Sequence, residues 1–237
     1  MIEIQHISKQ FGKFQVLKDV NLTCAPGQCI ALIGPNGCGK TTLIKSILGM
    51  VIPTSGTILF NGNNIASDYH YRHQIGYMPQ KGRYPDNMTI GQVFDMIKDI
   101  RNTKSELDEQ LIDAFRLNDI MDKKMMNLSG GTTQKVSASL AFLFNPDVLI
   151  LDEPTAGLDP LAAEILKEKI IAENKKGKLI FITSHLLSEL DDLVTDVVLM
   201  QEGDIRFHMT TSLLKEQTNT TSLAKAITFI LKRDHVQ

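Results

Sequence analysis

The chain has 237 residues, of which 43% are hydrophobic and 22% are charged, and its mean hydropathy is -0.05. This composition excludes an intrinsically disordered chain, because disorder requires low hydrophobicity together with a high net charge. The 25 Lys and Arg residues against 27 Asp and Glu residues give a net charge of -2, so we expect no stable binding to nucleic acid.

The first third of the chain predicts strands that enclose a glycine-rich loop and a helix. Partial apolar alternation indicates half-buried strands, and a continuous apolar run indicates a strand buried on both faces. Strands are predicted for residues 2–7, 16–22, 29–33, 57–60 and 75–78. The glycine-rich loop and a helical pattern over residues 41–48 follow the third of these strands.

From Thr89 onward the pattern becomes helical, and it alternates between strand and helix again after Pro146. Thr89 and Gln92 form a capping box at the start of the helical part. Further strands are predicted for residues 148–151, 179–183, 197–200 and 205–207, the last two as a hairpin. Asp159-Pro160 predicts a helix start, and the polar residues 215–222 predict a loop before a C-terminal helix. The fold class is therefore α/β, interrupted by a helical segment.

The segment Gly34-Pro35-Asn36-Gly37-Cys38-Gly39-Lys40-Thr41 matches G-x-x-x-x-G-K-[ST] between a predicted strand and a predicted helix. Water solvates a triphosphate well, so a competing loop must point many backbone N–H groups inward, which glycines permit. The following helix adds its positive N-terminal end. We expect Lys40 to neutralise the β- and γ-phosphate oxygens and Thr41 to bind Mg²⁺. The alternative is a glycine-rich turn that matches by chance.

Two adjacent carboxylates, Asp152 and Glu153, follow the buried run of residues 148–151. They are expected at the carboxyl edge of the sheet, where α/β sheets bind ligands. Because adjacent acids repel each other, an Mg²⁺ ion would stabilise the pair. Asp152 would hold the ion through water, and Glu153 would activate the attacking water. Alone, such a pair is more often a solvated turn, but the phosphate-binding loop in the same chain favours the functional interpretation.

A third segment, Leu128-Ser129-Gly130-Gly131, begins a predicted helix. A serine followed by two glycines at a helix start exposes N–H groups and a hydroxyl, which predicts a second phosphate-binding end. The alternative is an ordinary helix N-cap after a loop.

Taken together, the motifs resemble those of the ATP-binding-cassette (ABC) ATPase family. They occur in that family's order: the phosphate-binding loop, Gln80, Leu128-Ser129-Gly130-Gly131, Asp152-Glu153, Ala156-Gly157-Leu158-Asp159 and His185. The resemblance implies a P-loop NTPase core of mixed sheet with flanking helices, an N-terminal antiparallel β subdomain and an inserted helical subdomain. In a single domain of residues 1–237, it places the core in 1–86 and 146–210, the helical subdomain in about 87–145 and a tail in 211–237.

The resemblance implies ATP hydrolysis with ATP and Mg²⁺ as cofactors. Glu153 would orient and deprotonate the water, His185 would contact the γ-phosphate, and Gln80 would touch Mg²⁺ and the water. The implied catalytic residues are Lys40, Gln80, Glu153 and His185, and the implied Mg²⁺ ligands are Thr41, Gln80 and Asp152.

The family pairs two copies head to tail around two ATP molecules, so Ser129 and Gly131 would reach the γ-phosphate bound by the second copy. Asp159 would communicate across this dimer. Phe11 would stack on adenine, although a core phenylalanine is the alternative because Phe14 lies close by in the sequence. The implied ATP-binding residues are Phe11, Gly34, Pro35, Asn36, Gly37, Cys38, Gly39, Lys40, Thr41, Thr42, Ser129, Gly130, Gly131 and Asp159.

One position departs from the family pattern. Many members carry Gln after Leu-Ser-Gly-Gly, where this chain has Thr132. Because the serine hydroxyl and the glycine amides make the phosphate contacts, we expect activity to survive.

The partner is expected to be a membrane protein, although the chain itself is not. No segment approaches the ~20 apolar residues of a membrane helix, no signal peptide is evident, and three cysteines fit a reducing cytosol. The resemblance implies a cytoplasmic subunit bound to the inner face of the cell membrane through integral membrane permease subunits. The groove for their coupling helices would lie around residues 80–95.

The motifs look most like those of export-type transporters. A weaker resemblance, carried by Gly130-Gly131-Thr132-Thr133-Gln134-Lys135-Val136, is to ATPases that serve copper-site maturation of nitrous-oxide reductase. The alternative function is a soluble ATP-dependent regulatory or binding module, associated with a ribosome or nucleic acid and not coupled to transport. The sequence does not indicate the transported substance, because the membrane partner selects it.

Overall fold

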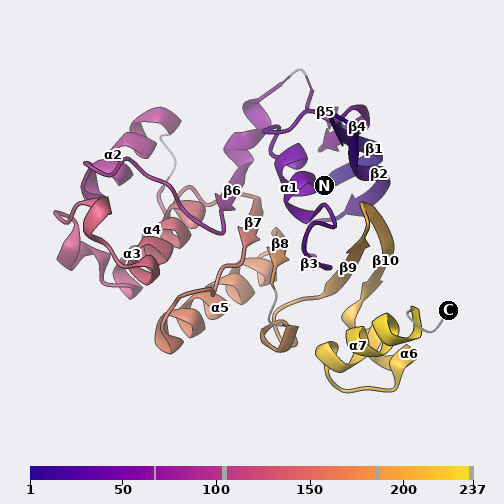
Figure 1. The fold of residues 1–237 in the computed structure, drawn as a ribbon. Coiled ribbons are helices and arrows are strands. Elements are labelled where there is room, and N and C mark those ends of the chain that lie inside the picture. Colours follow the sequence, from indigo (N-terminus) through magenta and orange to yellow (C-terminus); the bar gives the residue numbers. More distant parts are fainter. Residues whose placement is uncertain (67, 103–105, 185–186, 235–237) are drawn as a thin grey trace. The chain divides into compact units, whose positions relative to one another are not determined.

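The computed structural model describes residues 1–66, 68–102, 106–184 and 187–234 (Figure 1). The chain forms two compact units: Met1–Tyr71 with Asn174–Gln237, and Arg72–Glu173. Within the described ranges, every helix is too short or too polar to cross a bilayer.

The first unit contains an antiparallel sheet in the order β2-β1-β4-β5. Its strands are β1 (Ile2–Phe11), β2 (Phe14–Cys24), β4 (Ser55–Phe60) and β5 (Asn63–Asn64). β1 and β2 are longer than predicted, because irregularities interrupt the alternation while the pairing continues. His6 and Asp19, both with positive φ, lie at these irregularities, and pairing extends to Phe11 opposite Phe14.

The first unit also holds a mixed sheet that carries the phosphate-binding loop. Its strand order is β10-β9-β3-β8, with β3 parallel to both neighbours and β10 antiparallel to β9. The strands are β3 (Cys29–Ile33), β8 (Leu179–Thr183), β9 (Asp196–Gln201) and β10 (Asp204–Thr210). All of β3 is buried, as its continuous apolar run predicts, and α1 (Lys40–Ile47) follows it. The predicted hairpin is β9–β10.

The C-terminal part of the first unit contains η4 (Leu187–Glu189), α6 (Thr211–Thr218) and α7 (Leu223–Asp234). The predicted loop over residues 215–222 is therefore wrong for its first half. Thr210 caps α6 by accepting a hydrogen bond of 3.3 Å from the Leu213 N–H, and Leu214 is buried. A cap and a few buried contacts were enough to form a helix from a polar sequence whose apolar periodicity is weak.

The second unit combines two parallel strands with most of the remaining helices (Figure 1). The strands are β6 (Ile75–Met78) and β7 (Val148–Asp152). The helices are α2 (Ile90–Arg101), α3 (Gln110–Ala114), α4 (Gly130–Phe142) and α5 (Pro160–Lys175), with short turns η1 (His70–Gln74), η2 (Leu117–Ile120) and η3 (Met125–Asn127). α4 packs closely on β6, since a Cβ on Gly76 would lie 2.0 Å from the Ala141 carbonyl oxygen.

Local signals in the sequence predict two helix starts of this unit. At α2, Gln92 N–H donates to Thr89 Oγ1 over 3.2 Å, and Thr89 N–H donates to Gln92 Oε1 over 2.9 Å, so the capping box is confirmed. Asp159 accepts a bond of 2.9 Å from Ala162 N–H just before Pro160 begins α5. The α/β fold class with an antiparallel sheet, a mixed sheet and helices is also confirmed, whereas the subdomain boundaries near residues 87 and 145 stay a prediction.

Candidate functional site

The phosphate-binding loop joins β3 to α1 and passes very close to other strands of the first unit. Gly34 and Gly39 have φ values of 147° and 109°. A Cβ on Gly34 would lie 2.1 Å from the carbonyl oxygen of Met200, and one on Gly39 would lie 2.8 Å from the Leu17 side chain. Both the backbone conformation and the available space therefore require glycine at these positions.

Lys40 lies across the loop at the start of α1. Its ammonium group donates to the carbonyl oxygens of Gly34 and Pro35 over 2.7 and 3.0 Å. In the described part of the chain no side chain caps α1 at Gly39. The positive end of the helix and the lysine together give this loop the electrostatics of an anion site.

Phe11 ends β1 opposite Phe14, at the tip of the first hairpin. Their side chains are 50% and 78% exposed, which excludes the core alternative for Phe11. The Lys9 ammonium lies 4.8 Å from the centre of the Phe11 ring. Half of the Phe11 side chain is thus open to a ligand.

The carboxylates lie in the second unit, at the end of β7. Because β6 and β7 are parallel neighbours, Gln80, Asp152 and Glu153 lie at or just after the carboxyl ends of adjacent strands. Burial raises the pKa of Tyr77 in β6, and the Asp152 carboxylate raises it further. The Asp152 carboxylate therefore acts electrostatically on the neighbouring strand β6.

Glu153 has an unusual backbone conformation, with φ of 53° in the left-handed region. Glutamate seldom adopts this conformation, and residues held in it cluster at functional sites. The Gln134 side-chain amide donates to its carbonyl oxygen over 3.3 Å, and the Ala156 N–H donates to the same oxygen over 3.1 Å. Neighbouring groups thus fix the turn that carries the carboxylate.

The segment Ser129-Gly130-Gly131, called here the serine-glycine end, lies in the same unit. Ser129 is the N-cap of α4. Ser129 Oγ accepts a bond of 3.2 Å from Thr132 N–H and lies 2.9 Å from Thr132 Oγ1. The threonine that departs from the family pattern therefore contacts the serine hydroxyl directly. This contact orients the Ser129 hydroxyl at the start of α4.

The structure thus groups the predicted site residues in two sets. Phe11 and the phosphate-binding loop lie in the first unit, and Gln80, the serine-glycine end, the two carboxylates and Asp159 lie in the second. The predicted γ-phosphate ligand His185 lies outside the described residues.

Sequence reasoning missed two residues, Gln134 and Lys135. Gln134 contacts Glu153 as described, and the Lys135 ammonium donates to Asp159 Oδ2 over 2.7 Å. Their signal is spacing: three and four positions after Gly131, they share a face of α4 with that glycine.

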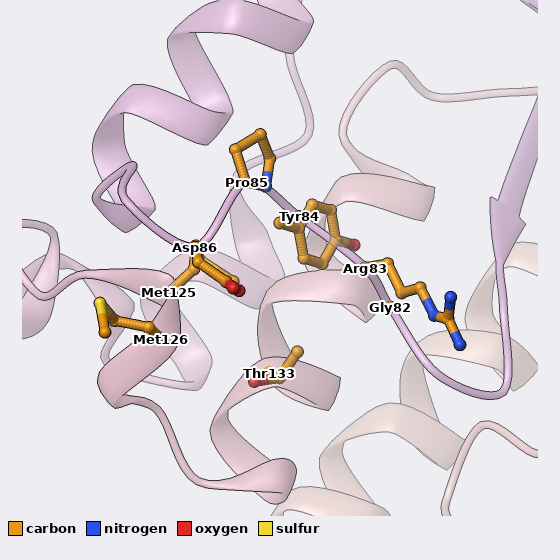
Figure 2. Close-up of a pocket in the computed structure, with 8 residues that line it drawn as sticks. All are labelled: Gly82, Arg83, Tyr84, Pro85, Asp86, Met125, Met126 and Thr133. Carbon is orange, nitrogen blue, oxygen red and sulfur yellow. The ribbon is translucent and has the colours of Figure 1, made fainter.

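A cavity of about 580 Å³ also lies in the second unit (Figure 2). Its walls come from the segment between β6 and α2, from η3 and from α4. Two backbone hydrogen bonds join η3 to the segment between β6 and α2. Met125 N–H donates to the Met88 carbonyl oxygen over 2.9 Å, and Met126 N–H donates to the Asp86 carbonyl oxygen over 3.2 Å. The segment between β6 and α2 lies within the groove predicted around residues 80–95, whereas η3 and α4 were not predicted as walls.

Comparison with known sequences identifies a family. Residues 17–156 match the family model described as ABC transporter. The chain is 34% identical over 207 residues to the uncharacterised ABC transporter ATP-binding protein YhaQ of Bacillus subtilis, covering 86% of this chain and 69% of that one. It is 33% identical to the Nod factor export ATP-binding protein I of Burkholderia lata (85% and 68%) and 33% identical to the sulfate/thiosulfate import ATP-binding protein CysA of Pectobacterium atrosepticum (86% and 64%).

Solved structures agree with this assignment. The ATP-binding subunit of an ABC transporter superposes with a TM-score of 0.89 at 29% identity, covering 98% of this chain and 99% of that one. The ATP-binding cassette MJ0796, a post-hydrolysis dimer bound to ADP and Pi, has a TM-score of 0.77 at 19% identity (89% and 98%) and shares the fold. The chain therefore belongs to the ABC transporter family, as an ATP-binding subunit that hydrolyses ATP in a reaction coupled to transport.

Proposed function

We propose that two copies of the chain close head to tail around two Mg·ATP molecules, and that this closure drives a conformational change in separate permease subunits. The observation that carries the proposal is that one chain holds two glycine-flanked helix N-termini, α1 in the first unit and α4 in the second. In a head-to-tail pair, α1 of one copy and α4 of the other face the same triphosphate. The related cassette MJ0796, solved as a dimer with ADP and Pi, supports this arrangement.

In the proposed reaction, water attacks the γ-phosphorus of ATP, and the bond to the β–γ bridging oxygen in line with it breaks, which gives ADP and phosphate. Gln80 orients the attacking water, and Glu153 accepts a proton from this water. Lys40 and His185 stabilise the charge that develops on the phosphate oxygens, together with Ser129 of the second copy. Loss of the γ-phosphate, which lies between the two copies, then lets the two copies separate.

The residues present fit Mg²⁺, which prefers oxygen ligands. Asp152 offers a carboxylate, whose charge raises the pKa of Tyr77. Thr41 offers an exposed hydroxyl in the first turn of α1. We propose Thr41, Gln80 and Asp152 as its ligands. When bound, the ion neutralises charge on the β- and γ-phosphate oxygens.

We further propose that the cavity in Figure 2 receives a helical segment of a permease subunit, which holds the chain at the inner face of the cell membrane. Tyr84, Pro85, Met125 and Met126 contribute apolar surface to the cavity, and Arg83 and Asp86 add one positive and one negative charge to its wall. Met126 is 64% exposed. An apolar side chain of the partner would bury this methionine on docking.

For the direction of transport we propose export. The motif resemblance and the similarity to Nod factor export proteins support it. The similarity to a sulfate/thiosulfate import protein supports the opposite direction. Transport assays decide between the two directions once the permease is identified. ATP-driven efflux from cells, or ATP-driven uptake into inside-out vesicles, would support export. No observation favours the non-transport alternative, because the relatives named above are transport proteins.

The pair is tested by hydrolysis assays with two variants. Lys40→Ala should lose both ATP binding and hydrolysis, because the phosphate charge is no longer neutralised. Ser129→Arg should bind ATP as a monomer but lose at least about 100-fold in hydrolysis, since removing one stabilising group commonly has that effect. Circular dichroism checks that both variants fold. Wild-type hydrolysis by Ser129→Arg would contradict the proposal.

Membrane docking is tested by recovery of the chain with its cell's membrane fraction. Met126→Asp places a charge in the cavity and should reduce recovery at least about tenfold. Met50→Asp is the matched control, because Met50 is 61% exposed in the first unit and should tolerate the same change. Equal recovery of the two variants would contradict the docking proposal.

A further inference from the structure

Helix α4 contacts the loop that carries the catalytic carboxylate. A Cβ built on Gly131 would lie 2.7 Å from the carbonyl oxygen of Gly157. The first turn of α4 therefore lies against the middle of the segment that joins β7 to α5. A larger residue at position 131 would push the two apart.

Two side chains on the same face of α4 extend this contact. The Gln134 side chain is buried and donates to the Glu153 carbonyl oxygen over 3.3 Å. The Lys135 ammonium donates to Asp159 Oδ2 over 2.7 Å. The contacts reach the beginning, the middle and the end of the segment 153–159. We call this set of contacts, made by Gly131, Gln134 and Lys135, the α4 brace.

Asp159 is fixed from two sides. Its Oδ1 accepts from Ala162 N–H over 2.9 Å at the start of α5, while its Oδ2 accepts from Lys135. The Lys135 hydrogen bond, followed by the Ala162 bond, lowers the pKa of Asp159 below its ordinary value. The Lys135 side chain is only 23% exposed, which limits the alternative positions of its ammonium group.

The brace joins two parts that serve different nucleotides. In the proposed head-to-tail pair, on which this inference rests, the serine-glycine end contacts the ATP held by the second copy, whereas Glu153 acts on the ATP held by its own chain. We propose that Lys135 and Gln134 are positioning residues, which set the Glu153 carboxylate according to whether the serine-glycine end of the same chain is engaged. Each side chain transmits the position of α4 to the loop after β7.

The expected signature is kinetic. Loss of the brace leaves the ATP-binding loop of the first unit intact, so the KM for ATP should stay within about twofold, while kcat falls about tenfold because Glu153 is misplaced. Coupling between the two ATP sites should weaken, so the Hill coefficient for ATP should fall toward 1. Because the Asp159 side chain is 53% exposed, its ion pair with Lys135 adds little to stability. The Tm should therefore change by no more than a few degrees.

Three variants test the two side chains separately. Lys135→Ala removes the ion pair, and Lys135→Arg restores a cation that can bind the carboxylate and should recover most of kcat and of the Hill coefficient. Gln134→Met keeps the volume and removes the donor, so it should behave like Lys135→Ala. The matched control is Lys98→Ala, which removes an ion pair of 3.1 Å with Glu109 in the same unit, far along the chain from the loop. Lys98→Ala should keep wild-type kinetics.

The outcomes separate this inference from the function on which it rests. If Lys135→Ala keeps the wild-type kcat and Hill coefficient while Ser129→Arg is inactive, the brace is overturned and the pair stands. If Lys135→Arg fails to recover activity and the KM and Tm shift as well, the residue is merely structural and the proposal is again overturned. If Ser129→Arg hydrolyses ATP at the wild-type rate, the pair fails, and the coupling role of the brace fails with it.

Discussion

The ammonium group of Lys169 lies 3.0 Å from Glu173 Oε1, and both side chains are almost completely buried, at 4% and 0% exposure. The same ammonium also donates to Asp108, just before α3, and to Gln110, the first residue of α3. One buried cation thus joins α5 to the segment before α3 within the second unit.

This cluster predicts a large effect on stability. Lys169→Met removes the ammonium group that contacts the buried Glu173 and the half-buried Asp108, and the loss lowers the free energy of unfolding by about 3–5 kcal/mol. Urea unfolding measures the change. The exposed pair Lys98–Glu109 supplies the control, because Lys98→Met should cost no more than about 1 kcal/mol. Similar decreases in the free energy of unfolding for both variants would show that burial does not make the Lys169 ion pair more important for stability.

The positive φ of Glu153 predicts a conflict between stability and activity. Glycine adopts this conformation without strain, so Glu153→Gly should unfold with a free energy about 1 kcal/mol higher than that of Glu153→Gln. Both variants lack the carboxylate and should lose hydrolysis. Denaturant unfolding of the two proteins side by side checks the difference, and equal stabilities would mean that the turn is not strained.

The exposed Phe11 ring predicts a contribution to ATP binding. Stacking of a base on an aromatic ring is worth about 1–3 kcal/mol, so Phe11→Ala should raise the Kd for ATP roughly 5- to 150-fold. Phe14→Ala is the matched control, because Phe14 pairs with Phe11 in the same hairpin. Titration with a fluorescent ATP analogue measures both. If Phe14→Ala weakens binding and Phe11→Ala does not, Phe14 is the stacking residue.

Two buried thiols predict a loss of stability at alkaline pH. Burial raises the pKa of Cys29 to about 12, with a smaller contribution from Asp196, and burial raises the pKa of Cys24 in the same way. The unfolded thiols ionise at about 8.5, so above that pH the folded protein binds more protons than the unfolded chain. Their contribution to stability is therefore complete below pH 8.5 and declines as the pH rises toward 12.

The Cys29→Ala variant tests this pH dependence. Between pH 9 and 11, its free energy of unfolding should fall less steeply than that of the wild type, by up to about 1.4 kcal/mol per pH unit. Urea unfolding at several pH values gives both slopes. Identical slopes would show that the Cys29 thiol ionises equally well in the folded protein.

Several features of the fold were predictable because their causes are local. The Thr89–Gln92 capping box and the Asp159-Pro160 helix start depend on residues a few positions apart, and the structure contains both. The five buried residues of β3 were equally evident as an apolar run. The α6 helix was missed because it depends on the burial of Leu214 rather than on a clear apolar period.

The contacts around the candidate site were less predictable because they join distant parts of the sequence. Gln134 and Glu153 are 19 positions apart, and Lys135 and Asp159 are 24 positions apart. Their approach depends on how α4 packs beside β6 and on the left-handed turn at Glu153, neither of which leaves a local pattern. The motif residues themselves were recognisable, but the side chains that position them were not.

In the proposed dimer, two copies of the chain share two ATP molecules. Light scattering of Glu153→Gln with and without Mg·ATP tests it most directly, because this variant should bind ATP but fail to release the pair by hydrolysis. We expect a mass of 26.4 kDa without nucleotide, twice that mass with Mg·ATP, and one bound ATP per chain. A mass that stays at 26.4 kDa while ATP is bound would contradict the head-to-tail pair.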